Sequence, residues 1–193
     1  MKTQRILLTI FLFGALFCLA QNEKEFVIKS IESNINIDGI GNEKEWDLAE
    51  WQSEFWLWRP NDSLKAEKQS RFKILKNEKN LYILVESLTD GKNFSTPSLK
   101  RDFNTYGADF ITLLFDTFSD GTNAFSFSTN PLGLKNEGLI SGGNQNYRTD
   151  RSYTWDTKWV VESKIFEDLY SVEIQIPFAS FFYNNNSNSW RFN

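Results

Sequence analysis

Short β-prone segments separated by turns recur along this chain, and they constrain the fold more than any other feature of the sequence. Alternating or continuous runs of branched and aromatic residues, bounded by Gly, Asn, Asp or Pro, are typical of strands. The expected strands are residues 26–28, 35–38, 55–58, 71–75, 81–85, 110–115, 124–128, 158–162 and 171–176. No segment between them keeps a helical period for three turns. The sequence therefore predicts an all-β fold, a β-sandwich with one or two short helices.

Local signals refine this expectation at four places. Residues 43–49 predict a short helix with Asn42 as its N-cap. Residues 76–80 predict a hairpin connection, and Pro177 is expected to end the last long strand. Residues 190–193 resemble the start of a strand with too few residues to complete a pairing. We therefore expect a domain truncated at its C-terminus, with a downstream domain missing.

The first twenty residues have the zones of a secretory signal peptide. Lys2 and Arg5 precede an apolar run from Ile6 to Phe17, and small residues flank a cut before Gln21. A membrane span needs about 20 apolar residues, which this run does not reach. The sequence predicts a signal peptide over 1–20 and one sandwich domain over 21–193, exported to the periplasm, the outer surface or the medium.

Two residue types that carry much of enzyme chemistry are missing from the expected domain. The chain has no histidine, and its one cysteine, Cys18, lies in the expected signal peptide. These absences exclude Ser-His-Asp and Cys-His catalysis, His-ligated zinc and thiolate metal sites. The net charge is −4 with both signs interspersed, and no basic face is evident, so nucleic acid is not expected as a partner.

Seven tryptophans are the most unusual feature of the composition. The apolar face of a sugar ring stacks on Trp or Tyr while neighbouring polar groups bond its hydroxyls. A first cluster, expected mainly in the core, comprises Trp46, Trp51, Trp56 and Trp58. A second cluster lies in a polar stretch, where core and ligand contact are equally favoured, and comprises Trp155 and Trp159 with Tyr147, Arg148 and Tyr153.

Residues 116–121 resemble part of a calcium loop. Asp116 and Asp120 occupy the first and fifth places and Gly121 the sixth, but the third place is Phe118, which cannot bind a cation. Asp116 and Asp120 are therefore candidate calcium ligands, and the alternative is a tight turn capped by the two carboxylates.

A pair of carboxylates could cleave a glycosidic bond without histidine. The available acidic residues are Glu137, Asp150, Asp156, Glu162 and Glu173. No sequence signal pairs any two of them across a cleft, and Glu173 is expected as a solvated or salt-bridged strand residue.

Five segments, taken in order and spacing, resemble a family 9 carbohydrate-binding module: residues 35–39, 46–49, 81–83, 109–116 and 173–178. Four further segments resemble, more narrowly, the front end of larger exported proteins in which such a module precedes a β-rich region of unknown activity: 101–102, 116–133, 155–159 and Trp190. The resemblance implies a β-sandwich, binding of sugars or polysaccharide ends, and calcium in some members.

Aligned on this family, the ring-stacking tryptophan falls at Tyr106 and the acidic residue of the central strand falls at Thr112, while Trp159 fits the second aromatic wall. The resulting hypothesis is a non-catalytic module of carbohydrate catabolism that binds a glycan. Its ring-stacking residues are Tyr106, Trp155 and Trp159, and its hydrogen-bonding residues are Asp109, Asn130, Arg148 and Asp156. The alternatives are the front part of a glycoside hydrolase acting on O-glycosyl bonds, with catalysis elsewhere, and a structural cell-envelope domain whose rings are core.

Overall fold

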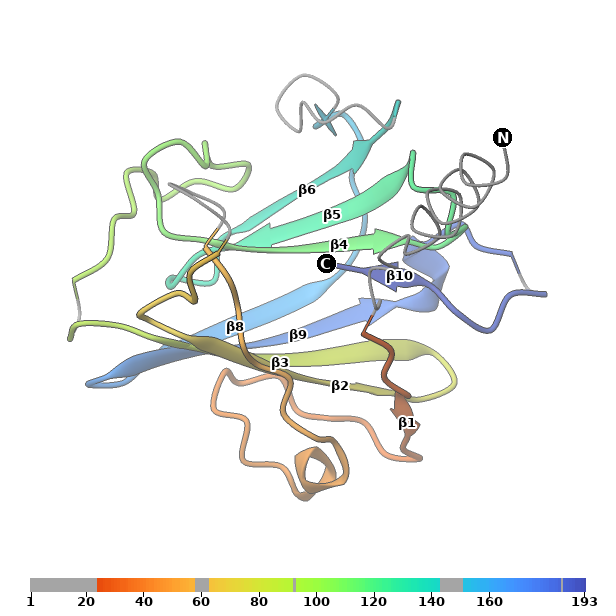
Figure 1. Ribbon diagram of the computed structural model, residues 1–193, viewed down its shortest axis with the longest axis horizontal. Coiled ribbons are helices and arrows are strands. Elements are labelled where there is room, and N and C mark those ends of the chain that lie inside the picture. The colour runs from red at the N-terminus through yellow and green to blue at the C-terminus, as the bar shows by residue number, and fades with distance from the viewer. Residues whose placement is uncertain (1–23, 58–62, 92, 143–150, 185) are drawn as a thin grey trace, which may run out of the picture.

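A computed structural model describes residues 24–57, 63–91, 93–142, 151–184 and 186–193. The expected signal peptide, Trp58, Tyr147, Arg148 and Asp150 lie outside these residues. Within them the chain forms two five-stranded sheets stacked face to face (Figure 1). The predicted β-sandwich is confirmed. No helix among the described residues has the length and apolar character needed to cross a membrane.

The first sheet has the strand order β1-β2-β3-β9-β8. Its strands are β1 (Lys29–Ser30), β2 (Ser70–Lys76), β3 (Asn80–Leu88), β8 (Val160–Ile165) and β9 (Leu169–Pro177). The second sheet has the order β10-β4-β5-β6-β7. Its strands are β4 (Ile111–Asp116), β5 (Ala124–Thr129), β6 (Lys135–Ile140), β7 (Arg151–Ser152) and β10 (Arg191–Phe192). All pairings are antiparallel except that of β1 with β2.

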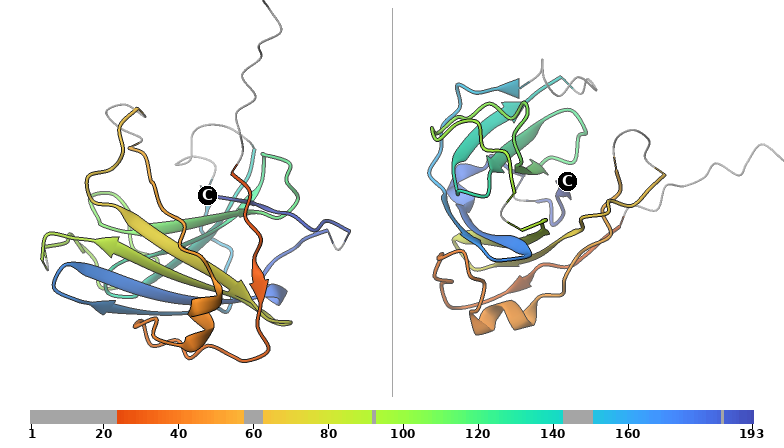
Figure 2. Two further views of the ribbon diagram at one scale, coloured as in Figure 1. Left: turned by 60° about the horizontal axis from the view of Figure 1, so that its bottom comes forward. Right: turned by 90° about the vertical axis from the view of Figure 1, so that its left-hand side faces the viewer.

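The core lies between the sheets, as the two layers in the right-hand view of Figure 2 suggest. Alternation along the strands sends every second side chain inward, so that Leu113 and Phe115 of β4 meet Phe125 and Phe127 of β5 in the buried cluster. The rings pack edge to face, with centroids 6.1 Å apart for Phe115 and Phe127. Burial of each such ring contributes about 1.5–3 kcal/mol, so the aromatic surplus largely serves the core.

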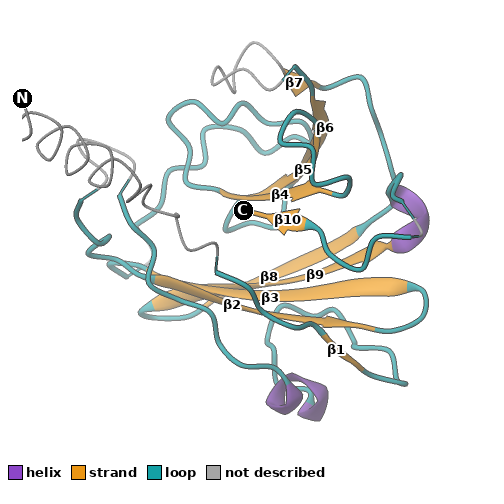
Figure 3. Ribbon diagram, turned by 45° about the vertical axis from the view of Figure 1, so that its right-hand side comes forward, coloured by secondary structure: helices purple, strands orange, loops and turns teal. Residues whose placement is uncertain are grey.

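A second, smaller core lies on the opposite face of the first sheet. The segment before β2 folds under this sheet and places Ile31, Ile35 and Trp46 against Leu75 and Leu84. Trp46 belongs to the 3₁₀-helix η2 (Lys44–Leu48), the lower of the two short helices in Figure 3. The sequence predicted this helix, but its N-cap is Glu43 without a side-chain capping bond, not Asn42. We refer to residues 31–49 as the N-terminal cover.

Glu173 joins the N-terminal cover to β9, which corrects the expectation of a solvated or salt-bridged residue. Its side chain is 0% exposed. Oε1 accepts a hydrogen bond from Trp46 Nε1 at 2.9 Å, and Oε2 accepts from the backbone N–H groups of Asp38 at 3.0 Å and Gly39 at 2.8 Å. Burial raises the pKa of Glu173 to about 7, and the nearby charge of Glu43 acts in the same direction.

The strand predictions succeed best in the centre of each sheet. The hairpin at 76–80 is confirmed by a bond from Asn77 N to Asn80 O of 2.9 Å, and β9 ends at Pro177 as expected. Residues 26–28 and 35–38 are not strands, and residues 55–57 contribute only an isolated bridge from Trp56 to Lys65.

Three strands were not predicted: β1, β6 and β7. β10 lies within the residues expected to start a strand, but the expectation that these residues are too few to pair is wrong, because Arg191 and Phe192 pair with Asp116 and Phe115 of β4.

Candidate functional site

The outward face of the second sheet is polar. Register places Thr112 of β4, Ser128 of β5 and Asn136 of β6 side by side, while their neighbours Leu113, Phe127 and Glu137 point into the sandwich. Thr112 and Ser128 share a hydrogen bond of 2.8 Å between their hydroxyl oxygens. Ser126, two residues before Ser128 on β5, is 0% exposed, and its hydroxyl has no hydrogen-bond partner among the described residues. We call Thr112, Ser126, Ser128, Asn136 and Arg151 the polar face.

Arg151 of β7 spans the polar face. Its Nη2 donates to Asn136 Oδ1 at 2.6 Å and to Ser128 Oγ at 3.3 Å, and its side chain is almost fully buried. Gly138 makes this possible, because a Cβ there would lie 2.6 Å from Ser152 O and 3.1 Å from Arg151 Nε. The bonds to Asn136 and Ser128 hold the Arg151 guanidinium against the second sheet, and a guanidinium binds oxygen ligands with a fixed geometry.

Two tyrosine rings are exposed in segments that adjoin the second sheet. Asn136 Nδ2 donates to Phe103 O at 2.9 Å, which fixes the loop before β4 against β6 on the outward face. Tyr106, further along this loop, is 75% exposed. Tyr153, just after β7, is 52% exposed, and its ring lies over the Arg151 guanidinium, with 4.8 Å from Cζ to the ring centroid.

Asp109 lies close to Tyr106 in sequence and is also exposed. Its Oδ2 accepts a bond from Ser95 N at 2.7 Å, and its own N–H donates to Ser95 O at 2.8 Å. These bonds tie the loop that carries Tyr106 to the segment before it. Of the predicted site residues, Tyr106 and Asp109 are exposed and lie on the loop before β4.

The two predicted tryptophans pack inward. Trp159 is 3% exposed, and its Nε1 donates to the buried Glu137 Oε2 at 3.1 Å. Trp155 is half-buried, with ring centroids 5.3 Å from Phe125 and 5.7 Å from Phe127. A ring enclosed in this way cannot stack on a sugar, so the role predicted for Trp159 is wrong. Trp155 covers the edge of the hydrophobic core at Phe125 and Phe127.

Asn130 is also buried and belongs to the turn between β5 and β6. Its Oδ1 accepts from the backbone N–H groups of Leu132 at 3.0 Å and Leu134 at 3.1 Å, and its side chain is 1% exposed. The residue therefore closes a turn, as Asn does in many loops, and is not placed to orient a ligand. Arg148 lies outside the described residues.

The acidic residues of the expected calcium loop bind their own turn. Asp116 accepts from the N–H groups of Phe118, Asp120 and Gly121 at 2.8–3.2 Å. Asp120 accepts from Thr122 and Asn123, and these bonds lower its pKa. Such contacts are those of the capped turn and do not leave the oxygens arranged around a cation. In the described part of the chain, the one group of three acidic side chains with oxygens within 4.8 Å is Asp38, Glu43 and Glu173, where Glu173 already accepts three N–H bonds.

A second polar feature lies at the side of the sandwich, where the chain crosses from β7 to β8. It is a hollow of about 440 Å³ lined by Arg101, Lys135, Asp156, Thr157, Lys158 and Trp159. Arg101 Nη2 binds both Asp156 Oδ1, at 2.5 Å, and Glu137 Oε1. We call this feature the basic hollow. It brings together the predicted Asp156 and Trp159 with three cations that sequence reasoning did not assign to the site.

The basic hollow also places two carboxylates on one guanidinium. Glu137 is 2% exposed, and burial raises its pKa. Asp156, by contrast, has a side chain that is 78% exposed. Because Glu137 is enclosed by Trp159 and Arg101, this pair is an ion-pair network and does not flank an open cleft as glycosidase carboxylates do.

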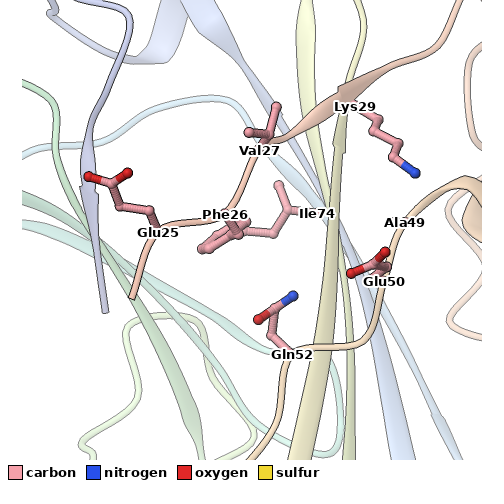
Figure 4. A pocket seen from close by; sticks show the side chains of 8 residues that line it. All are labelled: Glu25, Phe26, Val27, Lys29, Ala49, Glu50, Gln52 and Ile74. Carbon is pink, nitrogen blue, oxygen red and sulfur yellow. The ribbon is translucent and has the colours of Figure 1, made fainter. Parts of the chain in front are cut away.

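A further cavity of about 400 Å³ lies between the N-terminal segment, residues 49–52 and β2 (Figure 4). Phe26 and Ile74 meet inside it, and Glu25, Lys29 and Glu50 form its rim. Phe26 belongs to the aromatic cluster that closes this edge of the sandwich, with its ring centroid 6.0 Å from that of Phe72 and 6.4 Å from that of Phe192. None of the predicted site residues lines this cavity.

Comparison with known proteins identifies the fold. No family model and no curated protein sequence matches the chain. Among solved structures, a family 9 carbohydrate-binding module from Caldicellulosiruptor kristjanssonii matches in complex with glucose (TM-score 0.57, 18% identity, 86% of this chain and 74% of that chain). It also matches in complex with cellotriose (TM-score 0.55, 17% identity, 86% and 73%).

A protein from Bacteroides uniformis to which carbohydrate binding is ascribed matches similarly (TM-score 0.57, 12% identity, 84% of this chain and 76% of that chain). All three likenesses extend over most of the two-sheet architecture described above. The chain therefore has the β-sandwich fold of the family 9 carbohydrate-binding modules.

Proposed function

We propose that this domain binds carbohydrate on the outward side of its second sheet, with Tyr106 as the principal stacking ring. The observation that carries the proposal is the exposure of two tyrosine rings, Tyr106 and Tyr153, the second of which lies on Arg151 above a row of buried polar side chains. Solved modules with this fold bind glucose and cellotriose, which supports a sugar as the ligand.

The chemistry of the polar face suits a sugar. A pyranose ring presents apolar C–H groups to an aromatic ring and hydroxyls at its edge, and binding sites for such ligands combine flat rings with a few fixed polar groups. Arg151 and Asn136 are buried and fixed by their mutual bond, so they form a rigid support beneath the exposed ring of Tyr153, which then loses little conformational entropy when a ligand binds. In this proposal Asp109 and the small exposed part of the Arg151 side chain bond the sugar hydroxyls. Tyr153 adds to the aromatic surface on which the sugar ring lies.

Replacing Tyr106 with alanine is expected to weaken glucose or cellotriose binding about tenfold or more, because a stacked ring contributes on the order of 1.4 kcal/mol or more to binding. Isothermal titration calorimetry with the domain over residues 21–193 measures the change. Phe118→Ala is the matched control, since Phe118 is an exposed ring (52%) on the β4–β5 turn, away from Tyr106. Equal loss in both variants, or no sugar binding by the wild-type domain, would contradict the proposal.

The packing of Trp155 and Trp159 in or on the core favours a second candidate, a structural envelope domain without a sugar ligand. The same titrations separate the two candidates, because a purely structural domain binds no sugar.

We also propose that residues 1–20 direct export and that the domain acts as a non-catalytic module of a glycan-handling protein. The zones of the signal peptide support export. Sequencing of the mature N-terminus is expected to begin at Gln21, and retention of residues 1–20 would argue against this.

A further inference from the structure

The lining of the basic hollow contains three cations and one carboxylate. Arg101 is paired with Asp156 of the lining, and with Glu137 and Asp102 beside it. Lys135 and Lys158 also line the hollow, and no carboxylate oxygen of the described residues lies within 4.0 Å of either ammonium. Within the described residues, Lys135 and Lys158 thus form no direct ion pair, and the charges of Glu137, Glu162 and Asp156 act on Lys135 from a greater distance.

Lys135 is the more informative of the two cations, because it is partly buried. Its Nζ donates to Trp159 O at 2.5 Å and lies 5.5 Å from the centroid of the Trp159 ring. An ammonium carries three N–H donors, and among the described residues Trp159 O is its one hydrogen-bond acceptor. Burial, followed by the positive charge of Arg101, lowers the pKa of Lys135. An anion in the hollow would offset both effects.

Asp156 is the anion of the lining, and a ligand could displace its carboxylate from Arg101. Its side chain is 78% exposed and is attached to the hollow through Arg101, whereas Glu137 is enclosed. Exposed ion pairs of this kind contribute roughly 0–1 kcal/mol, so a ligand oxyanion can displace the Asp156 carboxylate from Arg101 at small cost. Displacement would leave a positively charged pocket formed by Arg101, Lys135 and Lys158.

We propose that the basic hollow binds the oxyanion of an acidic sugar, carried as a carboxylate or a sulfate group, through Lys135, Lys158 and Arg101. The inference rests on the proposed function for the sugar itself. The hollow and the polar face are connected through the backbone, because Asn136 of the polar face bonds Phe103 O while Arg101, two residues earlier, lies in the hollow, and Asp102 N bonds Lys135 O at 2.8 Å. Charge-assisted hydrogen bonds from ammonium and guanidinium groups are stronger than neutral ones.

Calorimetry at low ionic strength with glucose, glucuronate and glucose 6-sulfate tests the inference. We expect at least one acidic sugar to bind about tenfold more tightly than glucose and this advantage to shrink in 0.3 M salt, on the order expected for screened charges. The acidic sugar that binds more tightly identifies the preferred oxyanion as carboxylate or sulfate, and either result supports the inference.

Two variants move the affinity in opposite directions. Asp156→Asn removes the competing carboxylate, so the acidic sugar should bind about threefold more tightly. Lys135→Met keeps the aliphatic stem and removes the charge, so the ratio of acidic-sugar to glucose affinity should fall toward one. Lys164→Met, on the exposed part of β8, is the matched control and should keep the wild-type ratio.

The gain expected from Asp156→Asn cannot come from misfolding. If this variant weakens binding of the acidic sugar, Asp156 contacts the ligand and the inference is overturned. If glucose binds and neither acidic sugar binds more tightly, the inference is overturned while the proposed function stands. If no sugar of either kind binds, the proposed function fails as well. The inference is also overturned if acetate or inorganic sulfate binds as tightly as the acidic sugar, because the hollow would then bind anions regardless of the sugar.

Discussion

Replacing Glu173 with alanine is expected to destabilise the domain by about 3–5 kcal/mol at pH 5. The substitution leaves three buried N–H donors without an acceptor, those of Trp46, Asp38 and Gly39, and each such loss costs about 1–3 kcal/mol. A cavity between β9 and the N-terminal cover adds to the loss. Urea unfolding followed by tryptophan fluorescence measures the change in the free energy of unfolding.

The loss should be smaller at pH 8 than at pH 5. The pKa of Glu173 is raised to about 7 in the folded protein from its ordinary value of 4.5. A carboxyl with a raised pKa binds more protons in the folded state between these two values. Its contribution to stability is therefore present below about pH 4.5 and is lost as the pH rises through about 7, an effect on the order of 3 kcal/mol. The alanine variant lacks this dependence, so the wild type and the variant converge as the pH rises.

Glu162→Ala is the matched control for Glu173. Glu162 pairs with Glu173 across β8 and β9 but is exposed, and exposed substitutions usually change stability by less than about 0.5 kcal/mol. A loss below about 1 kcal/mol for Glu173→Ala, or the same pH dependence in the wild type and the variant, would show that Glu173 does not anchor the cover.

The central strands were predictable because their signal is local. β2, β3 and β9 carry long runs of branched and aromatic residues that bury one or both faces. β6 was not predictable on this basis, because Glu137 points inward, Asn136 points outward and Gly138 lies between polar contacts. β6 is a strand because it pairs with β5 on one side and with β7 on the other, and this pairing does not depend on the β-propensity of its own residues.

The burial of Trp159 shows why the candidate site was only partly predictable. The three residues before it are polar, which favours a surface position. The indole N–H is satisfied by Glu137, 22 residues away, and this pairing of a buried donor with a buried carboxylate carries no local signal. The sequence placed Glu173 on the correct strand face, yet it could not show that residues 31–49 cover that face.

The stacking candidate that remains, Tyr106, came from the family resemblance and not from the tryptophan count. Its exposure of 75% agrees with that assignment. Arg151 and Asn136 had no sequence signal, because their contact depends on the register of β6 and on the reach of a side chain from β7. Arg101 was noted only as part of a motif, and its role in the basic hollow depends on the fold.

Replacing Gly39 with alanine is expected to destabilise the domain by about 3–5 kcal/mol, for two separable reasons. Gly39 has a φ of +82°, a conformation that costs an L-residue about 1–2 kcal/mol. A Cβ at this position would also lie 2.7 Å from the Ser163 backbone carbon and 2.9 Å from Lys164 N, so β8 or the N-terminal cover would have to move. Overpacking of this kind costs about 1–3 kcal/mol more, and it would pull Gly39 N away from Glu173.

Gly91→Ala separates the two costs. Gly91 has a φ of +64°, yet nothing lies within 4 Å of the position its Cβ would take. This variant should therefore lose only the backbone term, about 1–2 kcal/mol, and chemical denaturation of both variants gives the steric term as their difference. Equal losses would mean that the cover does not press against β8. A larger loss for Gly39→Ala than for Gly91→Ala shows that the close contact of Gly39 with β8, together with its bond to Glu173, fixes the N-terminal cover on the first sheet.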